Sequence, residues 1–409
     1  MNRGAIAYIL AEFPSYTETF ILKETLFINK SFPLYIIALK KGKTTVNKSE
    51  YRELEDSLIY ITPFILVKSI GYCFLSSFRA KNVSKEWKNI FDSILKVNII
   101  NTLHHIKSLL TGLYISKLIK QKPIGHIHSH FANYPTDIAM VVSKFSGIPF
   151  SFSAHANDIY VNPKELTRKI TESKFVTTCT QYNKKWLDNL VIISERNKIH
   201  LIYHGVDLEY WQYNLTKNRQ EQKQILFIGR LIEKKGIIYL LEAVEQLKKK
   251  NHEIHLVIVG KGKDEQKLKN FCHSRELSKN VSFLGWQNPQ QIKTLFDCSN
   301  IFVLPSVIAS NGDRDGIPNV ILEAMASGLP VITTPISGIT EVIQHNYNGL
   351  LVPERDVNQL VDSILTLIYD EILRNSLRNN GLQTIIEKFD SEKCNMLLQD
   401  LFEKEIITE

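Results

Sequence analysis

The stretch Ile225–Gly236, I-L-F-I-G-R-L-I-E-K-K-G, decides the fold of this chain. Its first four residues, Ile225–Ile228, are apolar and predict a buried strand that ends at Gly229. Arg230 follows at the carboxyl edge of that strand, and Lys235-Gly236 opens the next helix. Two cations five residues apart can converge there on one anion, and the helix N-terminus adds unpaired N–H groups. The stretch therefore suits a diphosphate, although a capped surface turn would show the same pattern.

Similar apolar runs recur on both sides of this stretch and predict further strands at Ile6–Leu10, Leu34–Leu39, Phe175–Thr180, His255–Val259, Ile301–Leu304 and Val331–Thr334. Between them, Leu240–Leu247 and Gln359–Ile368 show the 3.6-residue period of helices. Strands that alternate with helices predict βαβ units and a parallel sheet. The pattern occurs before about residue 200 and again after about residue 222. We therefore expect two doubly wound α/β domains, joined by a linker at 205–222, with a ligand crevice at the carboxyl ends of their strands.

Composition limits the class of protein. The chain has 409 residues, of which 44% are hydrophobic and 22% charged, so it is neither disordered nor collagen-like. Its five cysteines are an odd number and form no C-x-x-C pair, which argues against a disulfide framework and favours a reducing compartment. We expect no signal peptide, because the short apolar run Ala5–Ala11 fits a buried first strand better.

Charge is unevenly distributed along the chain. Residues 1–200 carry a net charge of +12 and residues 201–409 a net charge of −4. A basic half favours nucleic acid, an anionic membrane or anionic substrates as partners, and a merely solvated basic surface is the alternative. Because the sequence has no nucleic-acid-binding motif and no basic stripe interleaved with aromatic residues, we expect no nucleic-acid partner.

The segment Leu58–Phe78 has the length of a membrane span, with 14 apolar residues in 21. Pro63, Lys68 and Gly71 interrupt it, and a lysine in the middle of a span is costly. The leading prediction is an ordinary buried helix. An interfacial helix on anionic lipid is the second, because lysines and Arg79 lie within and after the segment.

A second motif, D-G-I-P-N-V-I-L-E-A-M-A-S-G-L-P, occupies Asp315–Pro330 after the predicted strand Ile301–Leu304. Gly316 and Pro318 suit a loop that leads into a helix at about Asn319. Asp315 precedes this helix and Glu323 lies about one turn inside it, so two carboxylates can hold hydroxyls at two places along an extended ligand. A capping aspartate and a solvated glutamate are the alternative.

About 85 residues separate Arg230 from Asp315. In this order and spacing, the two motifs resemble the family 4 glycosyltransferases of the GT-B fold. That family carries G-R-x-x-x-x-K-G and then E-G-x-P-x-x-x-x-E-A-M-A-x-G-x-P-V-I. Asp315 replaces the first glutamate of the second motif, so the carboxylate is kept on a side chain one methylene shorter.

Three stretches of the N-terminal half resemble the subgroup of exopolysaccharide and colanic-acid-type transferases: Phe13–Glu24 (F-P-S-Y-T-E-T-F-I-L-K-E), His128–Phe131 (H-S-H-F) and Pro149–Tyr160 (P-F-S-F-S-A-H-A-N-D-I-Y). The resemblance covers nearly the whole chain. It implies domains at 1–204 for the acceptor and 223–385 for the nucleotide sugar, with the linker between them. It also implies that 386–409 return to the N-terminal domain, with a last helix at about Ser391–Glu403.

The resemblance assigns roles to the matching residues. Arg230 and Lys235 would neutralise the nucleotide diphosphate and stabilise the charge that grows on the leaving group. The donor-binding set would also include Asp315, Gly316, Asn319, Val320 and Glu323, with Glu323 on the ribose hydroxyls. His155 would sit beside the reacting sugar, so that the catalytic set is His155, Arg230, Lys235 and Asp315. Thr17, Glu18, Thr19, His130 and Asp158 would border the acceptor.

Metal and cofactor are both expected to be absent. The GT-B fold normally needs no divalent metal, and Asp313-Arg314-Asp315 has the letters of D-x-D without its strand–turn context. His126, His128 and His130 share one face of a strand and could bind zinc, but a polar edge of the active-site crevice is favoured.

The expected protein is thus a retaining, metal-independent glycosyltransferase. It would transfer a sugar from a nucleotide-diphosphate sugar to a saccharide acceptor, lipid-linked in our expectation, in surface polysaccharide biosynthesis. We expect a cytoplasmic location, with peripheral attachment to an anionic membrane surface through the basic N-terminal domain. An inactive GT-B scaffold or regulatory protein is the alternative.

Overall fold

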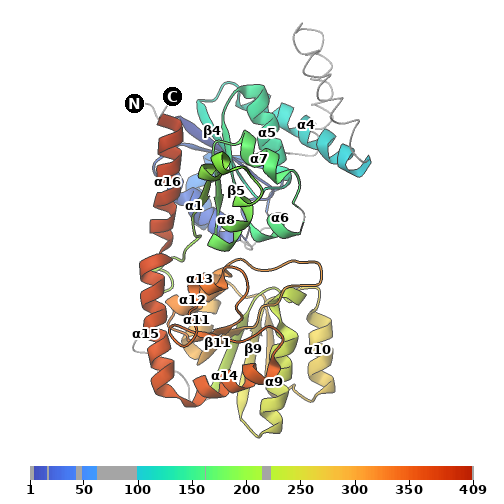
Figure 1. The fold of residues 1–409 in the computed structure, drawn as a ribbon, viewed down its shortest axis with the longest axis vertical. Coiled ribbons are helices and arrows are strands. Elements are labelled where there is room, and N and C mark those ends of the chain that lie inside the picture. The colour runs from blue at the N-terminus through green and yellow to red at the C-terminus, as the bar shows by residue number, and fades with distance from the viewer. Residues whose placement is uncertain are drawn as a thin grey trace. The chain divides into compact units, whose positions relative to one another are not determined.

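The computed structural model describes residues 4–15, 18–42, 48–61, 99–161, 163–213 and 223–407. The chain forms two compact units. The first, called here the N-terminal unit, comprises Met1–Thr178, Trp186–His200 and Asn395–Glu409, and the second, the C-terminal unit, comprises Cys179–Lys185 and Leu201–Cys394. Each unit is a sheet with helices packed against it (Figure 1). The chain therefore has the two-domain α/β architecture that the resemblance implies.

The N-terminal unit is built on a seven-stranded sheet in the order β3-β2-β1-β4-β5-β6-β7. Its strands are β1 (Ala5–Leu10), β2 (Leu34–Ala38), β3 (Leu58–Tyr60), β4 (Ile124–His130), β5 (Phe150–Ala154), β6 (Val176–Thr178) and β7 (Ile199–Leu201). Parallel pairing sets Tyr8 opposite His128 and His128 opposite Ser151. Since β1 lies between β2 and β4, the chain reverses the direction of sheet growth there, which makes the gap between β1 and β4 a topological switch point.

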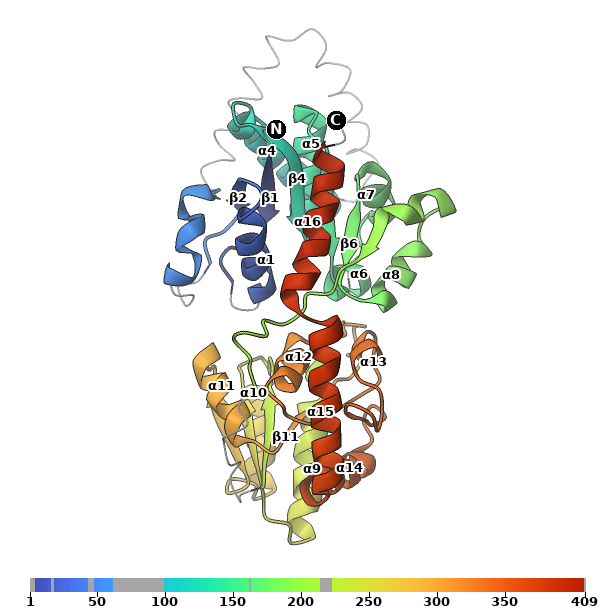
Figure 2. The same cartoon turned by 90° about the vertical axis from the view of Figure 1, so that its left-hand side faces the viewer.

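The two faces of this sheet differ. Ala7, Ile9 and Ile127 lie in one apolar cluster with residues of α4 (Ile99–Ile119) and α5 (Tyr134–Ser146). On the other face, Tyr8 and His128 contact Phe402 of α16 (Ser391–Ile407), which lies along the sheet (Figure 2). Alternate residues of a strand point to opposite faces, so Ala7, Ile9 and Ile127 lie on one face and Tyr8 and His128 on the other. The last helix thus returns to the N-terminal unit, as expected.

Six strands form the sheet of the C-terminal unit, in the order β10-β9-β8-β11-β12-β13. They are β8 (Lys223–Ile228), β9 (Ile254–Val259), β10 (Val281–Gly285), β11 (Ile301–Leu304), β12 (Val331–Thr333) and β13 (Leu350–Leu351). The helices are α9 (Ile237–Lys249), α10 (Glu265–Ser274), α11 (Pro289–Cys298), α12 (Asn319–Ala326), α13 (Ile339–Val342), α14 (Val357–Tyr369) and α15 (Glu371–Lys388). The switch point of this sheet lies between β8 and β11.

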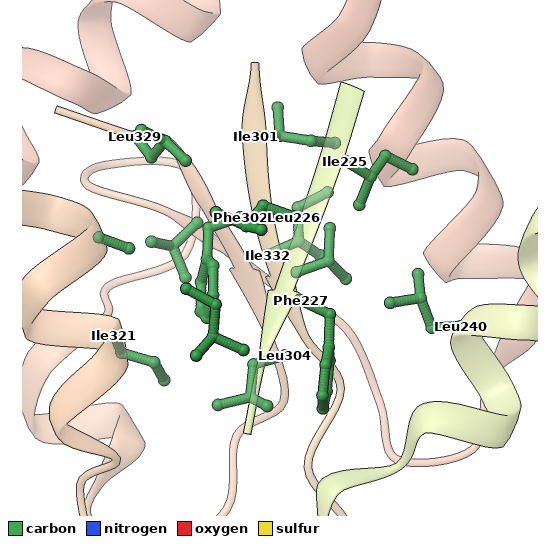
Figure 3. Close-up of a cluster of buried hydrophobic side chains, with 14 of the residues drawn as sticks. Ile225, Leu226, Phe227, Leu240, Ile301, Phe302, Leu304, Ile321, Leu329 and Ile332 are labelled. Atoms are coloured by element: carbon green, nitrogen blue, oxygen red, sulfur yellow. The ribbon is translucent and has the colours of Figure 1, made fainter. Parts of the chain in front are cut away.

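Central strands carry the core of the C-terminal unit. Phe227 and Phe302 are fully buried on β8 and β11. Figure 3 shows Leu240 of α9 on one side of these strands and Ile321 of α12 on the other. Because helices cover both faces, the strands are apolar along their whole length, and this is the pattern that predicts a parallel sheet.

The predicted strands are all present to within a few residues, and the helices at 240–247, 359–368, 319 and 391–403 lie in α9, α14, α12 and α16. The leading prediction for Leu58–Phe78 is wrong at its start, because Leu58–Tyr60 form the edge strand β3, which pairs with β2. Residues 62–78 lie outside the described part. Among the described helices, none is both long and apolar enough to cross a bilayer. Each of the four described cysteines is a free thiol.

Candidate functional site

The loops that leave β8 and β11 form the candidate site of the C-terminal unit. The two strands pair in parallel, with Leu226 opposite Phe302, so both loops start at the same edge of the sheet. The first loop carries Arg230 and the short 3-10 helix η4 (Glu233–Lys235), and the second runs from Pro305 to α12. Ligands of doubly wound sheets bind at this position.

Gly236 lets η4 approach the end of β11. Its φ of 64° lies in the left-handed region, and a Cβ atom placed there would come within 1.8 Å of the carbonyl oxygen of Pro305. A side chain at this position would push the two loops apart. The glycine thereby brings Lys234 and Lys235, both largely buried, towards the 313–315 loop.

Two lysines and two aspartates meet in this position. Lys235 donates from Nζ to Oδ2 of Asp315 at 2.6 Å, and Lys234 Nζ lies 2.9 Å from Oδ1 of Asp313. Lys234 Nζ is also 3.4 Å from Oδ1 of Asp315, whose Oδ2 accepts a 3.3 Å hydrogen bond from Ser306. We call Lys234, Lys235, Asp313 and Asp315 the ion-pair cluster. Only 11% of the Asp315 side chain is exposed.

The cluster keeps Asp315 ionised. Burial by itself raises the pKa of this carboxyl, but the charges of Lys235 and Lys234 outweigh burial and lower the pKa below its ordinary value. Asp315 is therefore an anion that already occupies the lysine expected to bind phosphate. A bound diphosphate would compete with Asp315 for Lys235.

The other predicted donor-side residues surround the cluster. Arg230 is exposed directly after β8, and its charge acts on Lys235. Asn319 and Val320 begin α12, and Glu323 lies one turn further, half-buried. At Gly316, an added Cβ would lie 3.3 Å from Thr180 Cγ2, so this position is also tight.

Lys234 and Asp313 are absent from the sequence-based prediction. They are 79 residues apart, and their pairing follows from the contact between η4 and the 313–315 loop. The available signal was a doubled lysine in the first motif and a second acid two residues before Asp315. The D-R-D stretch thus supplies one carboxylate to each lysine, Asp313 to Lys234 and Asp315 to Lys235.

The switch point of the N-terminal unit holds a different group of residues. His130, the last residue of β4, has Nε2 2.9 Å from Oε1 of Glu24 in α1 (Thr19–Asn29). The same oxygen accepts a 3.0 Å hydrogen bond from the hydroxyl of Tyr8. His130 Nδ1 lies 3.4 Å from Nε2 of His155, the residue before α6 (Ala156–Tyr160). We call Tyr8, Glu24, His130 and His155 the histidine relay; His130, predicted at the acceptor, has both ring nitrogens directed at protein groups.

Asp158 anchors the backbone around His155. Its two carboxylate oxygens accept the backbone N–H groups of Ala132 and His155. Burial raises the pKa of Asp158 to about 7, although both backbone bonds and the charge of Lys169 oppose that rise. Lys169, in α7 (Leu166–Glu172), is itself fully buried and pairs with Asp137 at 2.7 Å. The structure thus places Asp158, another predicted acceptor residue, in a capping role.

His126 and His128 form a hydrogen-bonded ladder with serines. His126 Nε2 lies 2.7 Å from Ser151 Oγ, while His128 contacts Ser151 at 2.8 Å and Ser153 at 3.0 Å through its two nitrogens. Burial lowers the pKa of His126 to about 3, so this ring is neutral. Glu24, His128 and His130 bring their ligand atoms within 4.8 Å of one another, but serines occupy both nitrogens of His128. Their arrangement favours the polar interior over the zinc alternative.

Of the remaining predicted acceptor residues, Thr17 lies outside the described residues. Glu18 immediately precedes α1, and Thr19 is the first residue of that helix. Glu18 and Thr19 follow β1 and so lie near the switch point between β1 and β4.

Comparison with known proteins agrees with this architecture. Residues 214–384 match the family model "Glycosyl transferases group 1". A protein of Escherichia coli K12, provisionally named as the colanic acid biosynthesis glycosyltransferase WcaL, is 26% identical over 88% of this chain and 89% of its own length. The UDP-Gal:alpha-D-GlcNAc-diphosphoundecaprenol alpha-1,3-galactosyltransferase of Escherichia coli is 26% identical over 74% of this chain and 80% of its own.

Among solved structures, Anabaena HepE in complex with UDP and glucose superposes with a TM-score of 0.71, at 15% identity, over 98% of this chain and 99% of its own. This likeness concerns the fold. Residues 214–384 are therefore similar to group 1 glycosyl transferases, and the chain as a whole shares the GT-B fold of this solved structure.

Proposed function

We propose that this glycosyltransferase transfers a sugar from a nucleotide-diphosphate sugar to a saccharide acceptor in surface polysaccharide biosynthesis. The observation that carries the proposal is the ion-pair cluster, which places Lys235 and Asp315 2.6 Å apart at the switch point of the C-terminal sheet. Relatives named for colanic acid biosynthesis and for galactosyl transfer to a diphosphoundecaprenol-linked sugar support the substrate classes.

On the donor side, Lys235 and Arg230 would bind the diphosphate. Arg230 can bind phosphate oxygens in a bidentate way, whereas Lys235 supplies a compact charge. Glu323 would accept hydrogen bonds from the ribose hydroxyls, with the N–H groups of Gly316, Asn319 and Val320 towards the phosphates. Cations beside the leaving group stabilise the transition state more than the ground state, because the diphosphate gains negative charge there.

Donor binding would exchange one ion pair for another. Lys235 would leave Asp315 for the diphosphate, and Asp315 would turn to a hydroxyl of the donor sugar. Lys234, which lies 3.4 Å from Asp315, would remain as the counter-charge that keeps this carboxylate ionised. The shorter side chain of aspartate suits a carboxylate that alternates between a buried lysine and the sugar.

The transfer would retain the anomeric configuration. The bond from the anomeric carbon to the diphosphate oxygen breaks, the bond to the acceptor oxygen forms on the same face, and the acceptor proton leaves with the diphosphate. His155 would stand beside the reacting sugar. Lys235 and Arg230 would take the part that a divalent metal plays in other transferases, so we propose metal-independent catalysis without a cofactor.

The acceptor is proposed to be lipid-linked, with the enzyme held peripherally at the cytoplasmic face of the membrane. The net charge of +12 over residues 1–200 supports this placement, since anionic lipid attracts basic surfaces. A transferase that works on a lipid-linked saccharide has to meet its acceptor at the membrane surface.

Calorimetric titration with UDP, GDP and dTDP and with their sugars, in the presence of EDTA, tests this function. We expect one nucleotide series to bind, and its affinity to fall at least tenfold in Arg230→Ala and Glu323→Ala. Arg275→Ala, at an exposed arginine of the same unit, is the control and should leave affinity unchanged. Failure of all three series to bind would overturn the transferase proposal and favour an inactive scaffold.

A further inference from the structure

A short segment of the chain, Cys179–Lys185, belongs to the C-terminal unit, although the stretches on both sides of it in the sequence belong to the N-terminal unit. It contains the first residues of α8 (Gln181–Asp188) and, just before them, Thr180, whose side chain is fully buried. Thr180 lies against two loops that follow neighbouring parallel strands, β11 and β12. We call residues 315–318, in the first of these loops, the donor loop, because Asp315 and Gly316 belong to the proposed donor site.

Two glycines face Thr180, one in each loop. A Cβ atom at Gly338, the residue before α13, would lie 2.5 Å from Cγ2 of Thr180 and 2.9 Å from its Cβ. At Gly316, a Cβ atom would lie 3.3 Å from the same methyl group. Gly338 has a φ of −74°, and the φ of Gly316 is not in the left-handed region either, so neither position needs glycine for a left-handed backbone. Space for the methyl group of Thr180 is therefore what the two glycines have in common.

Hydrogen bonds at the start of α8 fix the place of Thr180. Its Oγ1 accepts the backbone N–H of Asn183 at 2.9 Å. The two carboxylate oxygens of Glu341, in α13, accept the N–H groups of Gln181 and Tyr182 at 2.7 Å and 2.8 Å. The first N–H groups of a helix have no partner within the helix, so these acceptors hold the segment to α13. A movement of Thr180 away from the two loops would break these bonds.

We propose that Thr180 is a positioning residue of the donor site. Its methyl group, packed between Gly316 and Gly338, sets how closely the donor loop approaches the loop after β12. The two loops already lie close together there, since a Cβ atom at Gly338 would be 3.0 Å from Cγ1 of Ile317. This inference rests on the proposed function, in which Asp315 and the N–H group of Gly316 hold the donor sugar and its phosphates.

The cations proposed for the diphosphate lie on a different loop. Arg230 and Lys235 follow β8, whereas the loops against Thr180 follow β11 and β12. A displaced donor loop would move Asp315 away from the sugar hydroxyl but would leave these two cations on their own loop. We therefore expect Thr180 to affect the binding of a nucleotide sugar more than that of the nucleotide alone. A merely structural role would lower both affinities alike, because it would act through the folded fraction.

Calorimetric titration with three pairs of probes, UDP and UDP-glucose, GDP and GDP-mannose, and dTDP and dTDP-glucose, measures this difference. Gly338→Ala forces a methyl group against Thr180, so we expect the Kd of the nucleotide sugar to rise roughly tenfold or more and that of the nucleotide to change less than about threefold. Thr180→Ser in the same chain removes the obstructing methyl group and should lower the Kd of the nucleotide sugar again by about threefold or more. Gly381→Ala is the matched control, because a Cβ atom there would lie no closer than 3.5 Å to atoms outside its own helix.

Two single variants separate the methyl group of Thr180 from its hydroxyl. Thr180→Val keeps a methyl group at the position of Cγ2 and removes the Oγ1 cap of α8, so it should lower the melting temperature and keep the wild-type affinity for the nucleotide sugar. Thr180→Ser alone keeps the cap and leaves a gap between the loops, so it should weaken nucleotide-sugar binding by about threefold or more.

Amide ¹H–¹⁵N spectra of the full chain, labelled at its 18 glycines, give a readout without ligand. The Gly316 amide should shift in Gly338→Ala and move back towards its wild-type position when Thr180→Ser is added. An unshifted Gly316 amide in Gly338→Ala, equal losses of nucleotide and nucleotide-sugar affinity, or no recovery with Thr180→Ser would overturn the inference. If the wild-type protein binds none of the probes, the proposed function fails instead, and the Gly316 amide alone decides whether Thr180 positions the loop.

Discussion

The six strands of the C-terminal sheet follow the same order as the first six strands of the seven-stranded N-terminal sheet, but the two sheets differ in the chemistry at their switch points. In the C-terminal unit, the loops after β8 and β11 bring together two lysines and two aspartates, all within hydrogen-bond or ion-pair distance. In the N-terminal unit, the corresponding edge between β1 and β4 holds imidazoles and hydroxyls around the carboxyl groups of Glu24 and Asp158. The same topology thus positions lysine–aspartate ion pairs in one unit and a site built mainly of imidazoles in the other.

This difference indicates which ligand each site is suited to bind. A diphosphate needs cations, and cations that are buried need anions to pair with while the ligand is absent. A sugar hydroxyl needs oriented acceptors and donors, which neutral rings supply at a lower cost of desolvation. Doubly wound topology decides where a ligand binds, and the residues after the first and fourth strands decide which ligand it is.

The largest expected effect tests whether the buried charges of the N-terminal unit are structural. Lys169 is fully buried and pairs with Asp137, so Lys169→Met leaves this carboxylate only its 2.8 Å contact with His104. We expect a loss of about 3–5 kcal/mol in the free energy of unfolding, measured in urea. Nucleotide affinity should stay unchanged once the variant is folded. A loss below about 1 kcal/mol would show that this pair is not needed for folding.

Replacing Lys235, the lysine proposed to bind phosphate, should weaken nucleotide binding at the charged site of the C-terminal unit. Lys235→Met removes one charge-assisted hydrogen bond of about 1.5–3 kcal/mol, so we expect the Kd of the bound nucleotide to rise roughly 10- to 100-fold. Calorimetry measures the Kd, and Lys249→Met is the control, because Lys249 pairs with Glu245 on the exposed face of α9. An unchanged Kd in Lys235→Met would remove this lysine from the donor site.

Lys234 has no counterpart in the family motif. Its contribution therefore tests how far the charged site of the C-terminal unit depends on residues outside that motif. A double-mutant cycle of Lys234→Met and Asp313→Asn should give a coupling energy of about 0.5–3 kcal/mol in the free energy of unfolding. The two side chains are 2.9 Å apart and largely buried, so Lys234→Met removes the lysine that pairs with Asp313, while Asp313→Asn leaves Lys234 with its 3.4 Å contact to Asp315. Additive effects would mean that Lys234 acts on Asp315 alone.

The smallest effect concerns the pH dependence of the N-terminal unit. Because burial raises the pKa of Asp158 from 3.8 to about 7, protonation stabilises the folded state at low pH, and this stability is lost as the pH rises through 7. Linkage predicts that unfolding free energy falls by about 1 kcal/mol between pH 6 and pH 8. Asp158→Asn removes this titration, so the difference between the two proteins isolates it. Parallel pH profiles would contradict the raised pKa.

Periodicity and motif spacing predicted much of the molecule. The apolar runs that became β1, β2, β8, β9, β11 and β12 stand out because buried parallel strands are apolar on both faces. The motifs predicted that Lys235 and Asp315 belong to one site, since parallel strands place their following loops at one edge, but the ion pair between them is seen only in the structure. The prediction of a helix that starts at Leu58 was wrong, because a short edge strand resembles the start of an apolar helix in composition.

What the sequence by itself determined is the doubly wound fold, the number of domains and the charged residues Lys235 and Asp315 at the edge of the C-terminal sheet, because these depend on local pattern and on loops that follow adjacent strands. Only the tertiary structure decided that Lys234 pairs with Asp313 and that Glu24 reaches His155 through His130. Those partners are 79 and 131 residues apart, and nothing in a local pattern states which side chains a folded core brings within hydrogen-bond distance. Burial raises the pKa values of both Asp158 and Asp315, but the net shifts are opposite, because the two lysines beside Asp315 outweigh burial, whereas the backbone bonds and Lys169 near Asp158 do not.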